Sequence, residues 1–369
     1  MTATPTTPGS AARDAASPGP EPANPVLAEV IRSGIVESRH RGSLVVLASD
    51  GSVALALGTV RQPMLPRSSN KPMQAAAMLR CGLELDGSLL ALAAASHSGE
   101  EFHVAGVREI LRRAGLTEAD LQCPPDLPLD ESAQKAWLRA GGVADRVHMN
   151  CSGKHAAMLA TCVAAGWPTA TYRDPAHPLQ ARIKQTMERL AEEAVALTGV
   201  DGCGAPLFGI SLSGLARAFR TMVLSEPRSA ERRVADAMRA NPAWTSGTTR
   251  PEAAMVGAVP GLLMKSGAEG VCAFALSDGR AAAVKFDDGA HRPVAPLMAR
   301  LLADLIATEP VGPPGQAAVG QAAPPGQAAP PGQAAPPGGA DPAILAGLTT
   351  ATVTGGGEPV GEVRAVIPR

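Results

Sequence analysis

Residues 43–58 read SLVVLASDGSVALALG and give the first indication of the fold class. Apolar residues alternate on both sides of the dipeptide Asp50-Gly51, and Asp-Gly favours the tight turn between two antiparallel strands. The pattern returns at residues 270–286, GVCAFALSDGRAAAVKF, around Asp278-Gly279. Both stretches therefore predict β-hairpins.

The chain between and beyond these hairpins has helical and strand patterns of its own. Apolar residues recur at helical spacing, which predicts helices at 72–81, 103–115, 154–166, 178–197 and 292–306. Residues 349–366, TTATVTGGGEPVGEVRAV, predict two more strands joined by a glycine turn. Hairpins that flank a helical middle predict a mixed α/β fold of the α+β type, with an antiparallel sheet and flanking helices.

Two segments have a composition that does not support a packed core. Residues 1–24 are rich in Pro, Ala, Ser and Thr, and residues 311–340 repeat the unit PPGQAA without the glycine at every third position that collagen requires. We predict a disordered tail at 1–24, a globular body at 25–310, a low-complexity insert at 311–340, and strands at 341–369 that complete the body.

Composition excludes several classes of protein. A net charge of −1 and only 2% aromatic residues give no surface for nucleic acid. The sequence contains no run of 18 apolar residues, which argues against a membrane span. The N-terminus also lacks the apolar core of a signal peptide, so we expect a cytoplasmic protein whose six cysteines are reduced thiols.

The pattern Ser-x-x-Lys occurs twice. Ser132 and Lys135 lie in DESAQKAWLRAGG, a polar helical stretch that predicts a solvated face. Ser68 and Lys71 lie at the start of the predicted helix 72–81, where a spacing of three brings hydroxyl and amine to the same side. Burial and the helix N-terminus favour the neutral amine that a general base must be. The alternative is a helix-capping serine with an exposed lysine.

Two further stretches accompany Ser68 and Lys71. ASHSGE, residues 95–100, follows an apolar run and carries Ser96 and Ser98. LLMKSG, residues 262–267, carries Lys265 directly before the second hairpin, as in the third motif of serine β-lactamases and penicillin-binding enzymes. A Ser-x-x-Lys, a serine cluster and a Lys-Ser-Gly in this order indicate serine-dependent hydrolysis of an amide.

Seven stretches together resemble one family in content and order: GIVESRHRG, RSSNKPMQ, ASHSGE, NCSGKH, DPAHPLQ, DGCGAP and KSGAEG. The chain resembles the class 3, rhizobial-type L-asparaginases (the asparaginase II family) over roughly residues 25–300 and the last strands. The resemblance implies a fold similar to serine β-lactamases and serine-dependent glutaminases. It also implies hydrolysis of L-asparagine to L-aspartate and ammonia, and a homodimer.

The resemblance implies roles for particular residues. Two serine–lysine pairs would be Ser68 with Lys71 and Ser96 with Lys265, and we expect Ser68 to attack. A Zn²⁺ ion near the site would be bound by the residues Cys151, Lys154 and Cys203. The spacing of the cysteines alone indicates small buried apolar residues instead. A lysine can bind a metal only as the neutral amine, so the affinity should fall steeply as the pH falls.

The remaining candidates concern substrate binding. Asp201 is our candidate for the substrate's α-ammonium group and Arg67 for its α-carboxylate, with a structural ion pair as the alternative for each. His155 lies either beside the metal site or in a structural role.

Three other functions remain open. A serine β-lactamase normally carries an export signal and an asparagine in the middle motif, and this chain lacks both. A glutaminase differs by one methylene in the substrate, which a pocket distinguishes by only ~1–3 kcal/mol. A non-catalytic amino-acid-binding protein on the same fold would lose a member of a serine–lysine pair, whereas all four residues are present.

Overall fold

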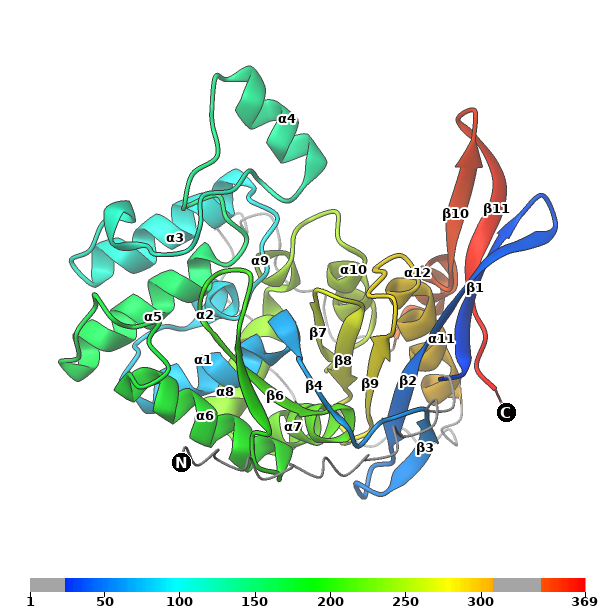
Figure 1. The fold of residues 1–369 in the computed structure, drawn as a ribbon, viewed down its shortest axis with the longest axis horizontal. Coiled ribbons are helices and arrows are strands. Elements are labelled where there is room, and N and C mark those ends of the chain that lie inside the picture. The colour runs from blue at the N-terminus through cyan, green and yellow to red at the C-terminus, as the bar shows by residue number, and fades with distance from the viewer. Residues whose placement is uncertain (1–23, 308–339, 369) are drawn as a thin grey trace, which may run out of the picture.

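The computed structural model describes residues 24–307 and 340–368. Within these ranges eight strands form one antiparallel sheet in the order β10-β11-β1-β2-β9-β8-β7, with β3 paired to β2 (Figure 1). Its strands are β1 (Val26–Arg32), β2 (Ile35–Leu47), β3 (Val53–Leu57), β7 (Leu263–Gly267), β8 (Val271–Ala275), β9 (Ala281–Phe286), β10 (Thr350–Gly355) and β11 (Glu358–Ala365). A smaller sheet contains β4 (Pro63–Met64), β6 (Pro206–Ser211) and β5 (Leu197–Val200).

The predicted hairpins are confirmed as β2–β3 and β8–β9. Each turns on its glycine, because Gly51 and Gly279 both have φ +90°, a conformation that favours glycine. In each turn the aspartate before the glycine accepts a hydrogen bond from the backbone N–H two residues on, Ser52 to Asp50 and Arg280 to Asp278. The two turns therefore have the same chemistry, which is why the sequence located both.

The main sheet is buried on both faces in its central strands. Successive side chains of a strand point to opposite faces, and here both faces meet helices. Val45, Ala273 and Ala283 join the larger core, which also contains the apolar face of α7 (Leu212–Leu224). Val46, Phe274 and Val284 join the second core with α11 (Val294–Ala307). A sheet covered on both sides explains the nearly continuous apolar runs in these strands.

The helices form two groups around the sheet (Figure 1). The larger group packs on one side and carries most of the first core; it consists of α1 (Lys71–Arg80), α2 (Gly87–Ala93), α3 (Glu101–Arg113), α5 (Ser152–Ala165), α6 (Pro178–Ala191), α7 and α8 (Ala230–Ala240). The second group is α10 (Pro251–Ala258), α11 and α12 (Pro342–Leu348). The short helices η1 (Arg67–Asn70), η2 (Glu118–Asp120), α4 (Glu131–Arg139) and α9 (Pro242–Thr245) lie in connections.

The predicted helix 178–197 is too long by six residues. Helix α6 ends at Ala191, because Glu192 adopts the left-handed conformation with φ +56°. The chain then enters β5 at Leu197, which pairs with Gly209 of β6. The apolar repeat continues past this point to Ala194, four residues after Leu190, so periodicity placed the end of the helix too late.

Strand β2 belongs to two parts of the sheet. Its first half pairs with β1, and residues 42–47 pair with β9. The crossing is at Gly42, where a side chain would come within 2.4 Å of the Lys285 carbonyl oxygen. The β1–β2 and β10–β11 hairpins extend beyond the body as an arm, defined here as residues 26–41 and 350–365 (Figure 1).

The predicted tail 1–24 and insert 311–340 fall almost wholly outside the described residues. The strands predicted after the insert are confirmed as β10 and β11, which pair with each other and, through β11, with β1. None of the helices in residues 24–307 and 340–368 has the length and apolar character needed to cross a membrane.

Candidate active site

Lys71 is a fully buried lysine at the first turn of α1. Pro72 follows it in the first turn, where a missing N–H costs the helix nothing. The Lys71 amine donates to three groups: the Ala95 carbonyl oxygen at 2.5 Å, Ser96 Oγ at 3.0 Å and Cys151 Sγ at 3.1 Å. Lys71 is therefore directed at Ser96, and the alternative of an exposed lysine at this position is excluded.

A second buried lysine reaches the same hydroxyl from the sheet. Lys265 lies in β7, and its Nζ is 3.0 Å from Ser96 Oγ and 2.7 Å from the Ser266 carbonyl oxygen. Ser96 itself follows α2, and its backbone N–H donates to the Thr245 carbonyl oxygen. One serine hydroxyl thus lies between two lysine amines that come from different layers of the fold.

The environment of Lys265 opposes a positive charge. Burial lowers its pKa, the nearby Lys71 lowers it further, and Glu252 acts in the opposite direction; the result is a pKa of about 7. Lys265 can therefore exist as a neutral amine near neutral pH, which an ordinary lysine cannot.

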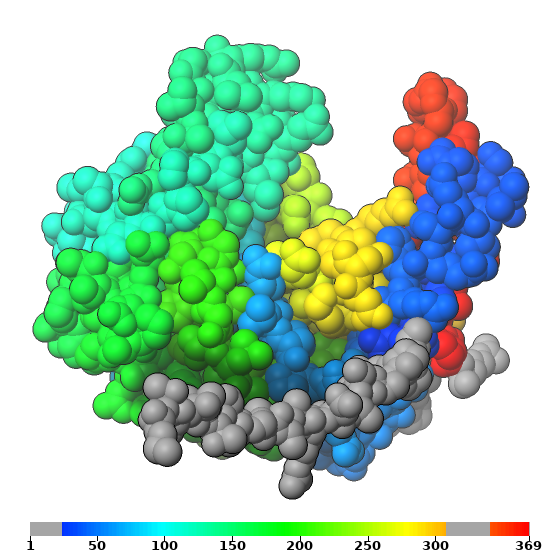
Figure 2. All heavy atoms as spheres, viewed as in Figure 1, coloured from blue at the N-terminus to red at the C-terminus, as the bar shows by residue number. Residues whose placement is uncertain are grey.

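Ser68 lines the same cavity as Ser96, although the hydrogen bonds of the described residues include none between Ser68 Oγ and Lys71 Nζ. The cavity has a volume of about 600 Å³. Its lining runs from Leu129, before α4, to Ala351 in the arm, and Figure 2 shows this face hollowed between those two parts. The structure therefore places both predicted serines at one cavity. Of these two serines, only Ser96 accepts hydrogen bonds from the two lysine amines among the described residues.

The backbone beside Ser68 packs tightly against β7. A side chain at Gly267 would come within 2.7 Å of the Pro66 carbonyl oxygen and 3.1 Å of the Ser68 backbone nitrogen. Only glycine allows this approach. No hydrogen bond among the described residues uses the Ser68 N–H, which leaves that donor at the wall of the cavity.

Arg67 and Asp201 contact each other. Arg67 Nε donates to Asp201 Oδ1 at 2.9 Å, and neither residue lines the cavity that contains the two serines. Arg67 has φ +50°, which costs a non-glycine residue roughly 1–3 kcal/mol unless its surroundings hold it. The ion pair thus fits the structural alternative: it holds the strained turn that presents Ser68.

The predicted metal ligands also converge. Cys151 precedes α5, Lys154 lies in its first turn, and Cys203 lies in the turn between β5 and β6. Lys154 Nζ donates to Cys203 Sγ at 3.1 Å. His155 Nδ1 is 2.6 Å from the Tyr172 hydroxyl, while its Nε2 is buried without a hydrogen-bond partner.

The two cysteines and Lys154 change each other's pKa values. The neighbouring Cys151 lowers the pKa of Cys203, and Lys154 and His155 lower it further. Burial opposes a charge on Lys154, but Cys203 and Cys151 outweigh it and raise its pKa. The described residues include no group of three or more His, Cys, Asp or Glu side chains placed to hold a metal ion. Two sulfurs and one amine do converge, and the amine must lose its proton before it can bind a metal.

The other Ser-x-x-Lys has none of these contacts. Ser132 and Lys135 are exposed on α4, and Lys135 pairs with Glu131 at 2.5 Å on the same helix. The prediction of a solvated face is confirmed.

Sequence reasoning missed several residues that line the cavity. Arg250, Glu252 and His291 are among them, and Glu252 is the single carboxylate in the lining. Arg250, Pro251 and Glu252 have the pattern of an ordinary helix start, and no signal in the sequence connects them to Ser96.

The chain is similar to known proteins in sequence and in fold. The family model described as L-asparaginase II matches residues 28–325. No curated protein matches the chain. Among solved structures, the chain is similar to Mglu in its native form, at 15% identity and a TM-score of 0.41, over 74% of this chain and 63% of that one. It is also similar to a β-lactamase from Mycobacterium bovis, at 12% identity and a TM-score of 0.37, over 68% of this chain and 88% of that one.

The two structural likenesses are too weak to carry a conclusion about activity, and the chain spans less than two thirds of the length of Mglu. The family match is different, because it covers most of the chain and includes Ser68, Lys71, Ser96 and Lys265. The resemblance expected from the seven motifs is confirmed. The match supports an amidohydrolase, and the chain belongs to the L-asparaginase II family.

Proposed function

We propose that this protein hydrolyses L-asparagine to L-aspartate and ammonia by serine–lysine acyl transfer. The observation that carries the proposal is the Ser96 hydroxyl, 3.0 Å from the amines of both Lys71 and Lys265, in a cavity that Ser68 also lines. A hydroxyl between two buried amines forms a path for a proton, which general acid–base catalysis requires. Family membership supplies the class of reaction, and the lysines supply a means to perform it.

In the proposed first step Ser68 Oγ attacks the side-chain amide carbon of asparagine. Lys71 first passes a proton through the Ser96 hydroxyl to the neutral Lys265, which frees a lone pair on the Lys71 amine. Lys71, one helical turn from Ser68, then accepts the Ser68 proton. The C–N bond breaks as this path returns a proton to the nitrogen, so ammonia leaves and an acyl-enzyme remains. Water then attacks the ester carbon, and the proton of that water returns to Ser68.

The tetrahedral intermediate needs donors for its oxyanion. The Ser68 backbone N–H is the candidate on this chain, since it has no other acceptor among the described residues and faces β7 at Gly267. Removal of one such donor typically costs roughly 10²–10³ in kcat.

Zinc fits the cluster of Cys151, Lys154 and Cys203 on one condition. Two thiols and an amine are a suitable donor set, but the protein must release the proton of Lys154, which both sulfurs stabilise. A bound ion would supply positive charge and a cross-link between α5 and the β5–β6 turn. Cys151 also contacts Lys71, so the cluster orients the catalytic amine with or without an ion.

Glutamine is the second candidate substrate, because one methylene changes binding by only ~1–3 kcal/mol. A homodimer is the assembly that we propose, to be checked by light scattering. The deciding test is ammonia release from L-asparagine and L-glutamine by wild type, Ser68→Ala and Ser96→Ala. Release from asparagine that both substitutions abolish supports the proposal; no release from either amide by the wild type would refute it.

A further inference from the structure

We propose that Glu252 is a positioning residue of this site: through Ser266 it holds the Lys265 amine beside Ser96, and its negative charge acts on that amine. The inference deepens the proposed function and rests on it for the role of Lys265. Nothing in the motifs of the sequence draws attention to Glu252, which has the appearance of a helix-start residue.

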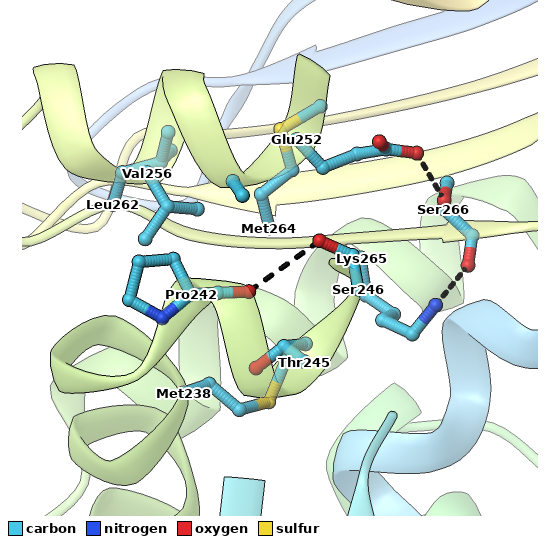
Figure 3. A pocket seen from close by; sticks show the side chains of 11 residues that line it. Met238, Pro242, Thr245, Ser246, Glu252, Val256, Leu262, Met264, Lys265 and Ser266 are labelled. Carbon is cyan, nitrogen blue, oxygen red and sulfur yellow. Dashed lines mark hydrogen bonds between the residues drawn. The ribbon is translucent and has the colours of Figure 1, made fainter. Parts of the chain in front are cut away.

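A continuous chain of hydrogen bonds connects Glu252 to Ser96. Ser266 Oγ donates to Glu252 Oε1 at 2.6 Å. The carbonyl oxygen of the same Ser266 accepts from Lys265 Nζ at 2.7 Å, and Lys265 Nζ is 3.0 Å from Ser96 Oγ. Figure 3 shows the first two contacts, with Glu252 and Lys265 approaching Ser266 from opposite sides.

The geometry of strand β7 places Lys265 and Ser266 on opposite faces. Neighbouring side chains in β7 point to opposite faces, so Lys265 faces Ser96 while Ser266 faces α10, which carries Glu252. Among the described residues, β7 is the last strand of the sheet and pairs only with β8. The position of an edge strand depends on its side contacts, and the Glu252–Ser266 bond is one such contact on the face away from the lysine.

Glu252 carries a buried negative charge at the cavity. It is the one carboxylate among the described residues that line the cavity, and its side chain is only 12% exposed. Within residues 24–307 and 340–368 its Oε2 has no hydrogen-bond partner, and it lies 3.5 Å from Arg250 Nε. Burial raises the pKa of Glu252, but Arg250, Ser266 and Lys265 outweigh it and hold the pKa below the usual value. The carboxylate is therefore ionised among these groups, and removing one partner of a buried ion pair leaves the other charge uncompensated.

The groups that face Lys265 come from three elements and one loop. They are Lys71 of α1, Arg250 and Glu252 at the start of α10, Cys272 of β8, and His291 before α11. Of these, Lys71 and Arg250 lower the pKa of Lys265, whereas Glu252 and Cys272 raise it. Loss of the Glu252 charge should therefore move the titration of Lys265 to lower pH, which the loss of a hydrogen bond alone would not do.

The test uses covalent labelling of the active serine by a fluorophosphonate, located by peptide mass spectrometry, and measured between pH 5 and 9 on the full chain. This readout needs an activated serine but no amide substrate. Glu252→Gln keeps an acceptor for Ser266 and removes the charge, whereas Ser266→Ala keeps the charge and removes the hydrogen bond. Glu231→Gln is the matched control: Glu231 of α8 is also buried in the first turn of a helix and pairs with an arginine, but that arginine is Arg80, at the opposite end of α1 from Lys71.

We expect the acid limb of the labelling rate to move down by about one pH unit in Glu252→Gln, in line with the effect of a nearby opposite charge. Ser266→Ala should leave the limb in place and lower the plateau roughly 10-fold. Glu252→Ala should move the limb and also lower the plateau, by roughly 100-fold if Lys265 shifts by about 1 Å. Glu231→Gln should change neither quantity.

An unmoved limb in Glu252→Gln, or a plateau within twofold of wild type in Glu252→Ala, would overturn the inference. Wild type that is not labelled at Ser68 or Ser96 would overturn it as well. Ammonia release from asparagine, assayed in parallel, separates the two proposals: a labelled wild type that releases no ammonia refutes the substrate and leaves the role of Glu252 standing.

Discussion

Two copies of Ser-x-x-Lys in this chain have the same spacing and opposite environments. Lys71 is fully buried, and its amine contacts Ser96 and Cys151. Lys135 is exposed on α4 and pairs with Glu131. The Ser-x-x-Lys spacing alone therefore does not predict a catalytic lysine. The lysine must also be buried against a second layer of the fold that supplies a hydroxyl and excludes water. In this chain that layer is the edge strand β7 and the segment after α2.

The largest expected effect tests the buried copy. Lys71→Met replaces the amine by an apolar side chain of similar length, which a buried site tolerates. We expect kcat/KM for asparagine to fall roughly 10³-fold, since a general acid–base group contributes about 10²–10⁴. Circular dichroism and the melting temperature should confirm that the variant is folded. A loss below tenfold would mean that the buried and exposed copies do not differ in chemistry.

The second prediction compares two serines of one motif. Ser96 contacts both amines, whereas Ser98 Oγ donates to the Ser246 carbonyl oxygen. We expect Ser96→Ala to lower kcat roughly 10²-fold or more. Ser98→Ala should keep kcat within a few fold and lower the free energy of unfolding by about 1 kcal/mol, the net contribution of one hydrogen bond. Equal losses of kcat would contradict the assignment of Ser96 to the proton path.

The third prediction concerns pH. Lys265 has a pKa lowered to about 7 by burial and Lys71. The neutral amine accepts the proton, so kcat/KM should rise with pH and level off above about 7. Solution pH profiles of wild type check this, and Lys265→Arg, which stays charged at all relevant pH values, should be inactive across the range. A flat profile between pH 6 and 8 would contradict a proton-accepting role for Lys265.

The fourth prediction concerns zinc at the cysteine cluster. Zinc binding must displace the proton of Lys154, so added Zn²⁺ should raise the melting temperature of the metal-free protein more at pH 8 than at pH 6. Cys203→Ser should weaken this effect. Equal stabilisation at both pH values, or none at pH 8, would argue against this ligand set.

The smallest effect belongs to the exposed copy. Lys135→Ala removes an ion pair between residues four apart on a helix surface, and such pairs contribute only about 0.3–0.5 kcal/mol. We expect kcat/KM within twofold of wild type, and denaturant unfolding should detect at most this small loss. A large loss of activity would show that α4 takes part in the site.

Much of the fold followed from local patterns. The Asp-Gly turns, the apolar strand runs and the helical repeats each depend on neighbours in sequence, so both hairpins and most helix positions could be predicted. The end of α6 could not, because a left-handed Glu192 has no composition signal. Residues of the site were found where a motif carried them, as with Ser68, Ser96 and Lys265.

Contacts between distant segments were beyond the reach of the sequence. The Ser-x-x-Lys spacing and the family resemblance paired Ser68 with Lys71, whereas the structure directs Lys71 Nζ to Ser96. Glu252 meets Ser266 only because α10 lies against one face of β7. Arg67 and Asp201 are 134 positions apart and form an ion pair outside the cavity. Such facts depend on tertiary packing, which spacing does not encode.

Strand β2 has a consequence for how the molecule opens. Residues 42–47 of β2 pair with β9, and residues 44–47 also pair with β3 and belong to the two cores, whereas residues 35–41 are held through the two hairpins of the arm. Amide hydrogens at 42–47 should therefore exchange with solvent only when the whole protein unfolds, while those at 35–41 exchange through local opening. The arm, which contributes Ala351 to the cavity, can thus fluctuate on its own timescale without disturbing the serine and lysines below it.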